Sequence, residues 1–467
     1  MVLLPTNKFQ IKDFPLRFNP QEALEALDIY DGLVRRKLGP AVLPENSSEY
    51  SIPVFYPKGE NKEIANKLQS IFKMGYERII PFGFGKMFML DENKISYIIH
   101  EYNNIQEIVD IIKNNYKHNK STLPIVLIKE KTNRADQNSE YYSIKRKLLS
   151  SGYISQIITI KDLLEREGTL KWSVLSIFSQ VFAKLGGLPY TLYKNFSIRS
   201  TSLNDKETVI IIGLGLSKDP SGNNTVGSSL VYDDRGHFKF LQFKVRPVPK
   251  ETNIKDVYSE IIENLLTDAY SKASEEMRLS HDQPKKVSVV IHYRGKEISK
   301  MEEQTINGIV ERFRESEIDG EVYLLKLIDS NIFLTDRNFS TGYPDIGYVI
   351  KVLNDLYMIQ LVGKMVFVFE EFSKLKQNVY HGVGNALLVN IRRYGGGNSE
   401  ISSDLAISLL KTVFGMARLN YVSISNLFVA LPTTVSFSQE IAYSLPRFSI
   451  TDLKNVSDWM NKRLWFI

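Results

Sequence analysis

A tyrosine, two lysines and two glutamines have the residue types and spacing to bind a phosphorylated ligand. Tyr141 and Lys145 are four residues apart within YYSIKRKLLSSGYISQ, so on a helix they lie on one face. An aromatic ring there offers a stacking surface for a base, and the ammonium offers charge to a phosphate. Gln156 follows a glycine-containing turn, and Gln180 and Lys184 are four residues apart on another expected helix. A second lysine could reach the same phosphate, so these residues are candidates for an anion pocket.

The same spacing also has a purely structural interpretation. A tyrosine and a lysine one helical turn apart commonly lie on a solvated face, where the lysine stem covers apolar surface and the ammonium stays in water. Spacing alone favours this interpretation over a binding site.

Up to about residue 190 the sequence alternates short apolar runs with amphipathic segments. β-branched runs bounded by turn residues predict strands at 78–82, 95–99, 124–128 and 156–160. Helical periodicity predicts helices at 62–72 and 105–116. Strands and helices in alternation are typical of a parallel, doubly wound sheet, so we expect a Rossmann-like α/β domain here.

A second α/β unit is expected from about residue 205. Strands are predicted at 207–213, 228–232 and 237–245, followed by a long amphipathic helix on which Val257, Ile261 and Leu265 share a row. A strand at 287–292, a helix ending near 313 and a strand at 321–327 complete the pattern. Three strands, then a helix and a further strand, is the order of an RNase H-like domain, although other α/β folds share parts of it.

Composition limits the classes of protein to which the chain can belong. Its 467 residues, 43% hydrophobic and 11% aromatic, suit a soluble protein of two or three domains at roughly 150 residues per domain. The net charge of +6 permits a polyanionic partner without requiring one. The absence of cysteine excludes disulfides and thiolate metal sites, and the six histidines show no zinc-ligand spacing. No signal peptide or membrane span is recognisable, so we expect a cytoplasmic protein without membrane insertion.

The YxxxK segment, the later glutamine, and KLGG followed by a proline and an aromatic residue resemble the MID-domain signature of Argonaute proteins. The resemblance implies that Tyr141 stacks on the first base of a guide strand. It also implies that Lys145, Gln156 and Lys184 bind the 5′-phosphate of that guide.

The resemblance further implies a structural Mg²⁺ at that phosphate. Argonautes that bind a divalent ion there take one ligand four residues before the second lysine and another from the terminal carboxylate. Gln180 stands at the first position, and the apolar ending LWFI suits a buried Ile467 whose carboxylate points inward. A terminal element that simply packs its apolar side chains explains the same ending, and that alternative stays open.

The resemblance extends from about residue 40 to the end and implies a short prokaryotic Argonaute built of MID and PIWI domains alone. Fewer than 130 residues precede the strand before Tyr141, which leaves no room for the N-terminal and PAZ domains of longer Argonautes. We therefore expect an N-terminal segment at 1–40 that packs on the PIWI domain, a MID domain at 41–195 and a PIWI domain at 196–467.

Two positions that the resemblance assigns to a nuclease centre are not acidic in this chain. A PIWI nuclease binds two divalent cations through clustered carboxylates. The strand IIIGLGLS puts Gly215 at the first acidic position, and VVIHYRG puts Arg294 at the second. Asp452 is the candidate for the final position. A glycine supplies no ligand and a guanidinium repels a cation, so we expect the nuclease site to be inactive.

Three arginines in this part of the sequence are candidates for contacts with a nucleic-acid backbone. Arg294 could contact a phosphate of a guide–target duplex, and Arg392 and Arg393, which follow an expected strand at 386–391, are similar candidates. A pair of surface arginines more often has no binding role.

The leading hypothesis is guide-directed nucleic-acid binding without cleavage. The resemblance implies an RNA guide, a complementary DNA target, and effector proteins that act in defence against invading DNA. The alternative from the enzyme class is an active guide-dependent metal endonuclease with relocated carboxylates, for which Asp219 and Asp452 are candidates. A nucleotide-binding α/β protein is a third hypothesis, but no Gly-rich phosphate loop opens a helix in this sequence.

Overall fold

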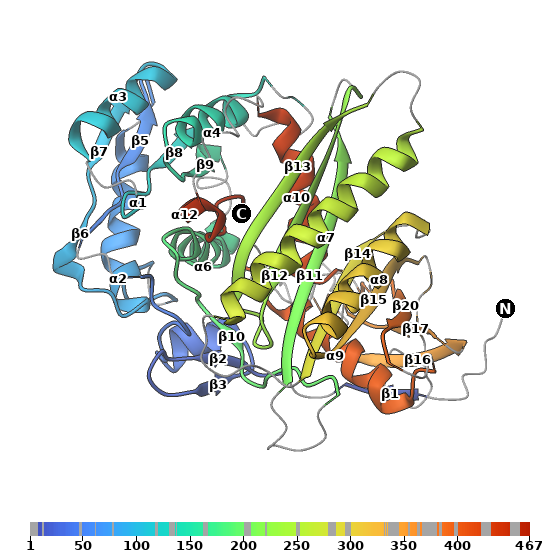
Figure 1. The fold of residues 1–467 in the computed structure, drawn as a ribbon. Helices are drawn as coiled ribbons and strands as arrows, with labels where there is room; N and C mark the ends of the chain where they lie inside the picture. Colours follow the sequence, from blue (N-terminus) through green and yellow to red (C-terminus); the bar gives the residue numbers. More distant parts are fainter. Residues whose placement is uncertain are drawn as a thin grey trace.

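Two α/β units lie side by side in the computed structural model, and short strands near residues 16–26 and 191–192 lie beneath them (Figure 1). The structure describes residues 8–11, 14–45, 49–60, 62–76, 79–116, 120–129, 136, 138–161, 167–199, 207–219, 222–248, 253–278, 286–294, 300–330, 332, 334, 345–353, 355–361, 365–366, 381–382, 385–396, 400–421, 431–448 and 458–467.

The first unit is built on a four-stranded parallel sheet with the order β7-β5-β8-β9. Its strands are β5 (Val54–Pro57), β7 (Ile99–Tyr102), β8 (Ile125–Ile128) and β9 (Gln156–Thr159). Its main helices are α1 (Lys62–Met74), α3 (Ile105–Asn115), α4 (Glu140–Ser150) and α6 (Glu167–Lys184). The doubly wound fold predicted from the alternating pattern is confirmed.

Strand β8 illustrates why these residues form a central strand. All four of its residues, IVLI, are buried, which requires helices on both faces of the sheet. Val126 belongs to the apolar cluster that contains Ile108 of α3 and Leu148 of α4. Its neighbour Ile125 belongs to the cluster that contains Phe178 of α6. Successive residues therefore face opposite helix layers, as the pleat of a strand requires.

The strand predicted at 78–82 is wrong over its described residues, 79–82. Residues 79–82 form a turn, and Ile80 makes only an isolated bridge to Tyr76 ahead of α2 (Phe84–Met87). Pro81 has no amide hydrogen to donate to a ladder, so extended pairing stops there. The first strand of the sheet is instead β5, and the strand predicted at 95–99 is divided between β7 and the short β6 (Ile95–Ser96), which pairs with β4 (Tyr50–Ser51).

The second unit is built on a nine-stranded mixed sheet with the order β1-β16-β17-β20-β15-β14-β11-β12-β13. Strands β11 (Glu207–Lys218), β12 (Asn224–Tyr232) and β13 (Phe238–Pro247) form an antiparallel meander. Strands β14 (Lys286–Arg294) and β15 (Asp319–Asp329) continue from β11 in parallel. Strands β16 (Tyr348–Leu353), β17 (Leu356–Ile359) and β20 (Leu387–Tyr394) extend the sheet, and β18 (Met365–Val366) pairs separately with β19 (His381–Gly382). The RNase H-like order predicted for this unit is confirmed.

Helices cover both faces of the nine-stranded sheet. On one face α7 (Ile254–Arg278) and α8 (Lys300–Glu315) share a core with Ile212 and Leu214 of β11. On the other face lie α9 (Ser403–Arg418) and α10 (Thr433–Ser444). His292 of β14 is fully buried between these two helices, with its ring nitrogens 2.9 Å from the Thr412 hydroxyl and 2.8 Å from the Thr434 hydroxyl. Burial lowers the pKa of His292 to about 3, so its imidazole is neutral and structural.

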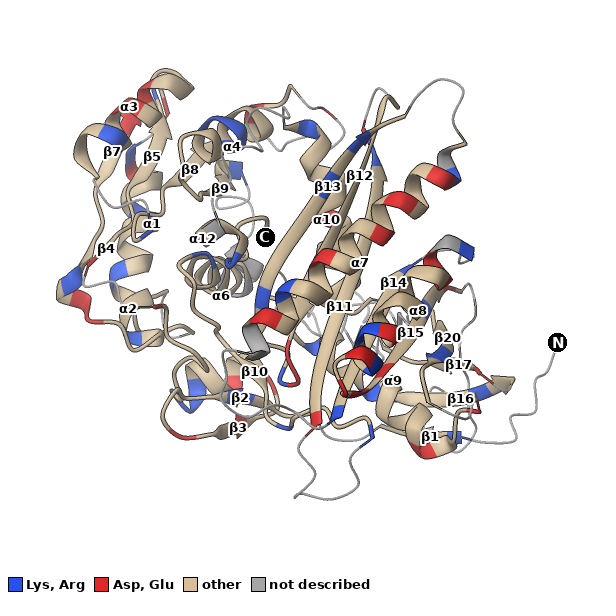
Figure 2. Cartoon of the chain, viewed as in Figure 1, with Lys and Arg blue, Asp and Glu red and all other residues tan. Residues whose placement is uncertain are grey.

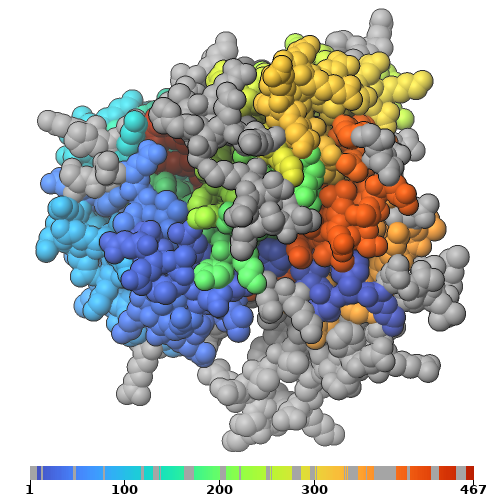
Figure 3. All heavy atoms as spheres, turned by 60° about the horizontal axis from the view of Figure 1, so that its bottom comes forward, coloured from blue at the N-terminus to red at the C-terminus, as the bar shows by residue number. Residues whose placement is uncertain are grey.

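The first forty residues contact both units. Strand β1 (Lys8–Gln10) pairs with β16 at the edge of the nine-stranded sheet. Strand β2 (Leu16–Phe18) lies between β3 (Leu24–Ala26) and β10 (Thr191–Leu192). Figure 3 shows this N-terminal part in dark blue on the surface, next to orange segments of the second unit. No helix in the part of the chain that the structure describes is long and apolar enough to cross a membrane.

Candidate functional site

Three elements of the first unit bring together the four residues predicted to bind a phosphorylated end. Helix α4 contributes Tyr141 and Lys145, the start of β9 contributes Gln156, and the end of α6 contributes Lys184. The Lys184 Nζ donates to Gln156 Oε1 at 2.5 Å and to the Ser155 carbonyl at 3.2 Å. The Lys145 Nζ lies 5.7 Å from the centre of the Tyr141 ring. Lys145 is only 4% exposed and Lys184 only 1%, so neither lysine lies on a solvated helix face.

The end of the chain reaches this site from the second unit. Leu464, Trp465 and Phe466 are buried, and Ile467 is half-buried. The Lys145 Nζ donates to the Trp465 carbonyl at 3.2 Å. In Figure 1 the C-terminus accordingly lies beside α6 and α12 (Asp458–Asn461), between the two units. We call the four residues Tyr141, Lys145, Gln156 and Lys184, with the chain end, the lysine pocket.

Arg463 fastens the chain end to the first unit. Its Nη1 donates to the Lys120 carbonyl at 2.6 Å and to the Lys184 carbonyl at 3.4 Å. Its guanidinium also lies 4.8 Å from the centre of the Trp459 ring. Lys184 is the last residue of α6, so its carbonyl has no partner within the helix and depends on an outside donor. Arg463 thus supports the backbone of one of the pocket lysines.

The electrostatics of the lysine pocket favour an anion. Burial lowers the pKa of Lys145 to about 8, against the raising effect of the Glu440 carboxylate on α10. Burial, and then the charge of Lys145, lower the pKa of Lys184 well below its ordinary value. A negative charge bound between two such ammonium groups would offset both their repulsion and their lost hydration. Figure 2 shows further Lys and Arg residues on α4 and along β13, whereas acidic residues follow α7.

Of the two residues expected to hold a metal, Gln180 lies beside the lysine pocket, and Ile467 ends the chain two residues after Trp465. The Gln156 Nε2 donates to Gln180 Oε1 at 3.1 Å, which places Gln180 directly beside the phosphate-binding candidates. An amide oxygen and the terminal carboxylate of Ile467 are hard oxygen donors of the kind that Mg²⁺ prefers. Within the described ranges no group of three His, Asp or Glu side chains could hold a metal ion. The donors present therefore fit Mg²⁺ only together with phosphate oxygens and water.

The C-terminal edge of the parallel strands forms a second site, which we call the strand-end site: Gly215, Arg294, Asp329 and Gln439. At Gly215 an added Cβ would stand 2.3 Å from the carbonyl carbon of Ser438 and 2.6 Å from the Gln439 nitrogen. Real Cβ atoms do not approach backbone this closely, so α10 lies directly on β11 and any side chain at 215 requires the helix to move. Glycine is thus required sterically at the position to which the resemblance assigns an acidic residue of a nuclease centre.

Arg294 ties three elements together at the strand-end site. From the end of β14 its Nη1 donates to Gln439 Oε1 of α10 at 2.8 Å, and its Nη2 forms an ion pair with Asp329 at the end of β15. Both charged side chains remain accessible, since Arg294 is 38% exposed and Asp329 is 56% exposed. The site therefore carries one cation and one carboxylate.

The two arginines after the expected strand at 386–391 are held by carboxylates. Arg392 forms an exposed ion pair with Glu303 of α8 at 2.7 Å. Arg393 binds Glu321 in bidentate fashion, with nitrogen–oxygen distances of 2.8 and 2.7 Å, and Glu321 is only 7% exposed. Arg393 belongs to β20 beside Tyr323, near the start of β15, so it lies at the opposite end of that strand from Asp329.

Of the two acidic candidates for a relocated nuclease centre, Asp219 is the one that lies in the described part of the chain. Asp219 lies in the turn after β11, where its Oδ2 accepts from Asn224 Nδ2 at 2.8 Å. Asp452 lies outside the described residues.

Sequence reasoning missed Gln439 of α10, Asp329 of β15 and the contact of Lys145 with the Trp465 carbonyl. Gln439 and Asp329 carried no signal, because nothing near them in the sequence indicates that they meet Arg294. The Trp465 carbonyl is a backbone group, which no residue type reveals. Only the apolar ending of the chain hinted at a buried terminus.

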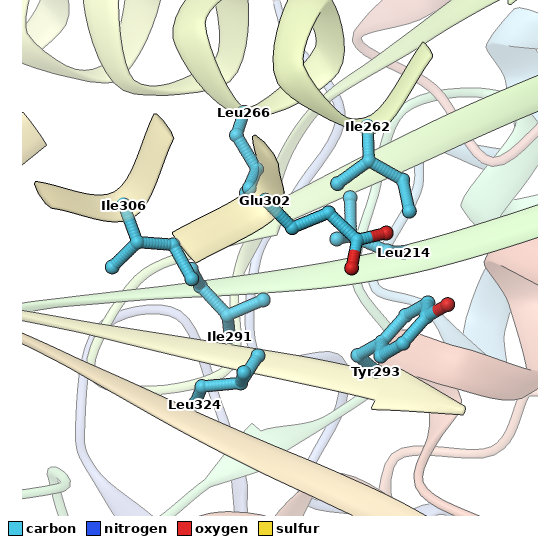
Figure 4. A pocket seen from close by; sticks show the side chains of 8 residues that line it. All are labelled: Leu214, Ile262, Leu266, Ile291, Tyr293, Glu302, Ile306 and Leu324. Atoms are coloured by element: carbon cyan, nitrogen blue, oxygen red, sulfur yellow. The ribbon is translucent and has the colours of Figure 1, made fainter. Parts of the chain in front are cut away.

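A small pocket on the opposite face of the sheet is a poor candidate for a phosphate. Figure 4 shows the Glu302 carboxylate and the Tyr293 ring among aliphatic side chains from β11, α7, α8 and neighbouring strands. The pocket offers a carboxylate and no cation among its lining residues, so it would repel an anion. Its lining consists of Leu214, Ile262, Leu266, Ile291, Tyr293, Glu302, Ile306 and Leu324.

Comparisons with known proteins agree with this architecture. Residues 125–352 match the family model of the Piwi domain. The fold is similar to that of Clostridium butyricum Argonaute bound to a guide DNA and a 19-mer target DNA, with a TM-score of 0.61 and 15% identity over 95% of this chain and 53% of that one. It is also similar to the Argonaute of Methanocaldcoccus janaschii in complex with guide DNA, with a TM-score of 0.57 and 15% identity over 98% of this chain and 57% of that one. This chain thus spans little more than half the length of those Argonautes, and a comparison with curated proteins found no match.

Proposed function

We propose that the chain binds a guide nucleic acid by its 5′-phosphate in the lysine pocket and holds a complementary target strand without cutting it. The observation that carries this proposal is a pair of almost fully buried lysines, Lys145 of α4 and Lys184 of α6, near enough for the charge of one to lower the pKa of the other. Lys184 also donates to Gln156 of β9. A buried pair of cations without an anion is unfavourable, which is the usual sign of a site that a ligand completes.

Each pocket residue has a definite task in this proposal. The ammonium groups of Lys145 and Lys184 donate to phosphate oxygens, and the Gln156 amide, already bonded to Lys184, orients one of them. The Tyr141 ring, half-buried beside Lys145, stacks on the first base. Mg²⁺ bound by Gln180 and the Ile467 carboxylate would neutralise the remaining phosphate charge.

The absence of cleavage is proposed from the strand-end site. A metal nuclease needs clustered carboxylates, whereas Gly215 has no room for a side chain and Arg294 brings a positive charge. A guide-loaded cleavage assay with Mg²⁺ or Mn²⁺ distinguishes this proposal from an active endonuclease.

The finer parts of the proposal rest on the resemblance to short prokaryotic Argonautes. They are a MID domain at 41–195, a PIWI domain at 196–467, an RNA guide, a DNA target, and effector proteins in cytoplasmic defence against invading DNA. Sequencing the nucleic acid that co-purifies with the protein, with its end chemistry, tests the guide type and the 5′-phosphate together.

The binding claim is tested with Lys145→Met combined with Lys184→Met, because methionine keeps the length of the side chain and removes the charge. A charge-assisted hydrogen bond contributes about 1.5–3 kcal/mol, so the double variant should bind a 5′-phosphorylated guide at least about a hundredfold more weakly. It should bind a 5′-hydroxyl guide about as well as the wild type does. Lys147→Met, an exposed lysine on the same helix, is the matched control. Equal binding of phosphate and hydroxyl guides by the wild type would show that the pocket assignment is wrong.

A further inference from the structure

The strand-end site lies where ligands of open α/β sheets commonly bind. Arg294 is the last residue of β14 and Asp329 is the last residue of β15, and these strands run parallel as neighbours. The carboxyl ends of parallel strands therefore meet at one edge, with α10 laid across it. Side chains at such an edge are presented to a ligand by a rigid sheet rather than by a loop.

The guanidinium of Arg294 is only partly used by the protein. It makes one hydrogen bond to Gln439 and one ion pair to Asp329, and a guanidinium carries five N–H donors. Its remaining N–H groups have no partner among the residues that the structure describes, and the side chain is 38% exposed. A planar fork of donors with free hydrogens suits a phosphodiester.

The carboxylate of Asp329 opposes the binding of a phosphate by Arg294. Asp329 is 56% exposed and pairs with the same guanidinium, so a phosphate that approached Arg294 would meet a competing negative charge. Gln439 is neutral and holds the guanidinium in place from α10.

We propose that Arg294 binds a backbone phosphate of the target strand, and that Asp329 competes with that phosphate for the same guanidinium. The proposal rests on the proposed function, because the guide held in the lysine pocket is what brings a target strand to this edge. Arg294 then supplies the positive charge that metal ions supply in a nuclease, but it does not promote cleavage. Asp329 keeps the contact weak until base pairing holds the strand in place.

A purely structural role for this ion pair makes the opposite prediction. If the ion pair between Arg294 and Asp329 only links β14 to β15, then removing either partner breaks the same bond. Both variants should then change target affinity in the same direction. If they compete for a phosphate, then Arg294→Gln removes the binding group and Asp329→Asn removes its rival. The two variants should therefore change target affinity in opposite directions.

The experiment uses the full chain loaded with a 5′-phosphorylated guide and measures the affinity for a complementary target across salt concentrations. We expect Arg294→Gln to bind the target about tenfold more weakly, with a salt slope smaller by about 1, and Asp329→Asn to bind it about threefold more tightly. Arg36→Gln is the control, since Arg36 is similarly exposed and pairs with Asp31 at 3.8 Å in the N-terminal segment.

A second measurement locates the contact on the target. Neutral methylphosphonate linkages are placed one at a time along the target strand. At one position the neutral linkage should weaken target binding by the wild type and should have no further effect on target binding by Arg294→Gln. The inference would be overturned if both variants changed target affinity in the same direction. It would also be overturned if every linkage position that weakens binding by the wild type also weakened binding by Arg294→Gln. If the guide-loaded wild type showed no affinity for a complementary target, the proposed function itself would be overturned.

Discussion

Raising the pH from 7 to 9 should weaken binding of a 5′-phosphorylated guide by at least about tenfold and leave binding of a 5′-hydroxyl guide nearly unchanged. In the free protein the pKa of Lys145 is lowered to about 8, mainly by burial. About nine tenths of its side chains are charged at pH 7 and about one tenth at pH 9. A bound phosphate favours the charged form and raises this pKa, so binding takes up a proton in this window. The affinity therefore falls as the pH rises through 8, and Lys184 adds to the fall because its pKa is lowered too.

Fluorescence anisotropy with 3′-labelled guides measures both affinities, in a pH range where the phosphate is already close to a dianion. Calorimetry in two buffers of different ionisation enthalpy counts the protons taken up on binding. Lys145→Arg is the informative variant, because a guanidinium stays charged throughout this range and the pH response should shrink. If phosphate and hydroxyl guides lose affinity in parallel, or no proton is taken up, the reasoning about the lysine pocket is refuted.

Three further predictions concern the supports of the two sites. Gly215→Asp should destabilise the protein by about 1–3 kcal/mol, because the new side chain meets the backbone of α10, and the Tm measures this loss. The same variant should show no guide-dependent cleavage in an assay with Mn²⁺. Arg463→Met should weaken binding of a phosphorylated guide by about fivefold while sparing a hydroxyl guide, because the end of α6 loses its outside donor. Arg393→Met should lower the free energy of unfolding by about 2 kcal/mol, because the buried Glu321 loses its bidentate partner and keeps Arg199 at 3.6 Å and the Tyr323 hydroxyl. Arg392→Met at an exposed pair should lower it by less than about 1 kcal/mol, and urea unfolding measures both.

Much of the fold could be predicted from local sequence patterns. The alternation of apolar strands and amphipathic helices is a property of short segments, and it predicted the strands near 125–128, 156–159 and 286–294 and the helices near 62–74 and 105–115. The wrong strand at 78–82 and the missed strand β5 share a cause. Both are short apolar runs next to prolines, and whether such a run pairs depends on a neighbouring strand that is distant in sequence.

The lysine pocket was only partly readable in the sequence. The shared helix face of Tyr141 and Lys145 follows from a spacing of four, but that spacing also suits an exposed face. Their burial is decided by contacts such as that of Lys145 with the Trp465 carbonyl, 320 residues away. A backbone acceptor at such a separation leaves no trace in residue types.

The sequence by itself determined the chemistry that each site lacks or offers: no carboxylate at Gly215, a cation at Arg294, and two lysines with a glutamine near the end of the first unit. Tertiary structure alone decided how those groups are used. It laid α10 against Gly215, paired Arg294 with Asp329 and Gln439, and buried both lysines until their charges favour an anion. The physical reason is that charge and side-chain volume are fixed by residue type, whereas hydration and contact depend on which distant segments the fold brings together.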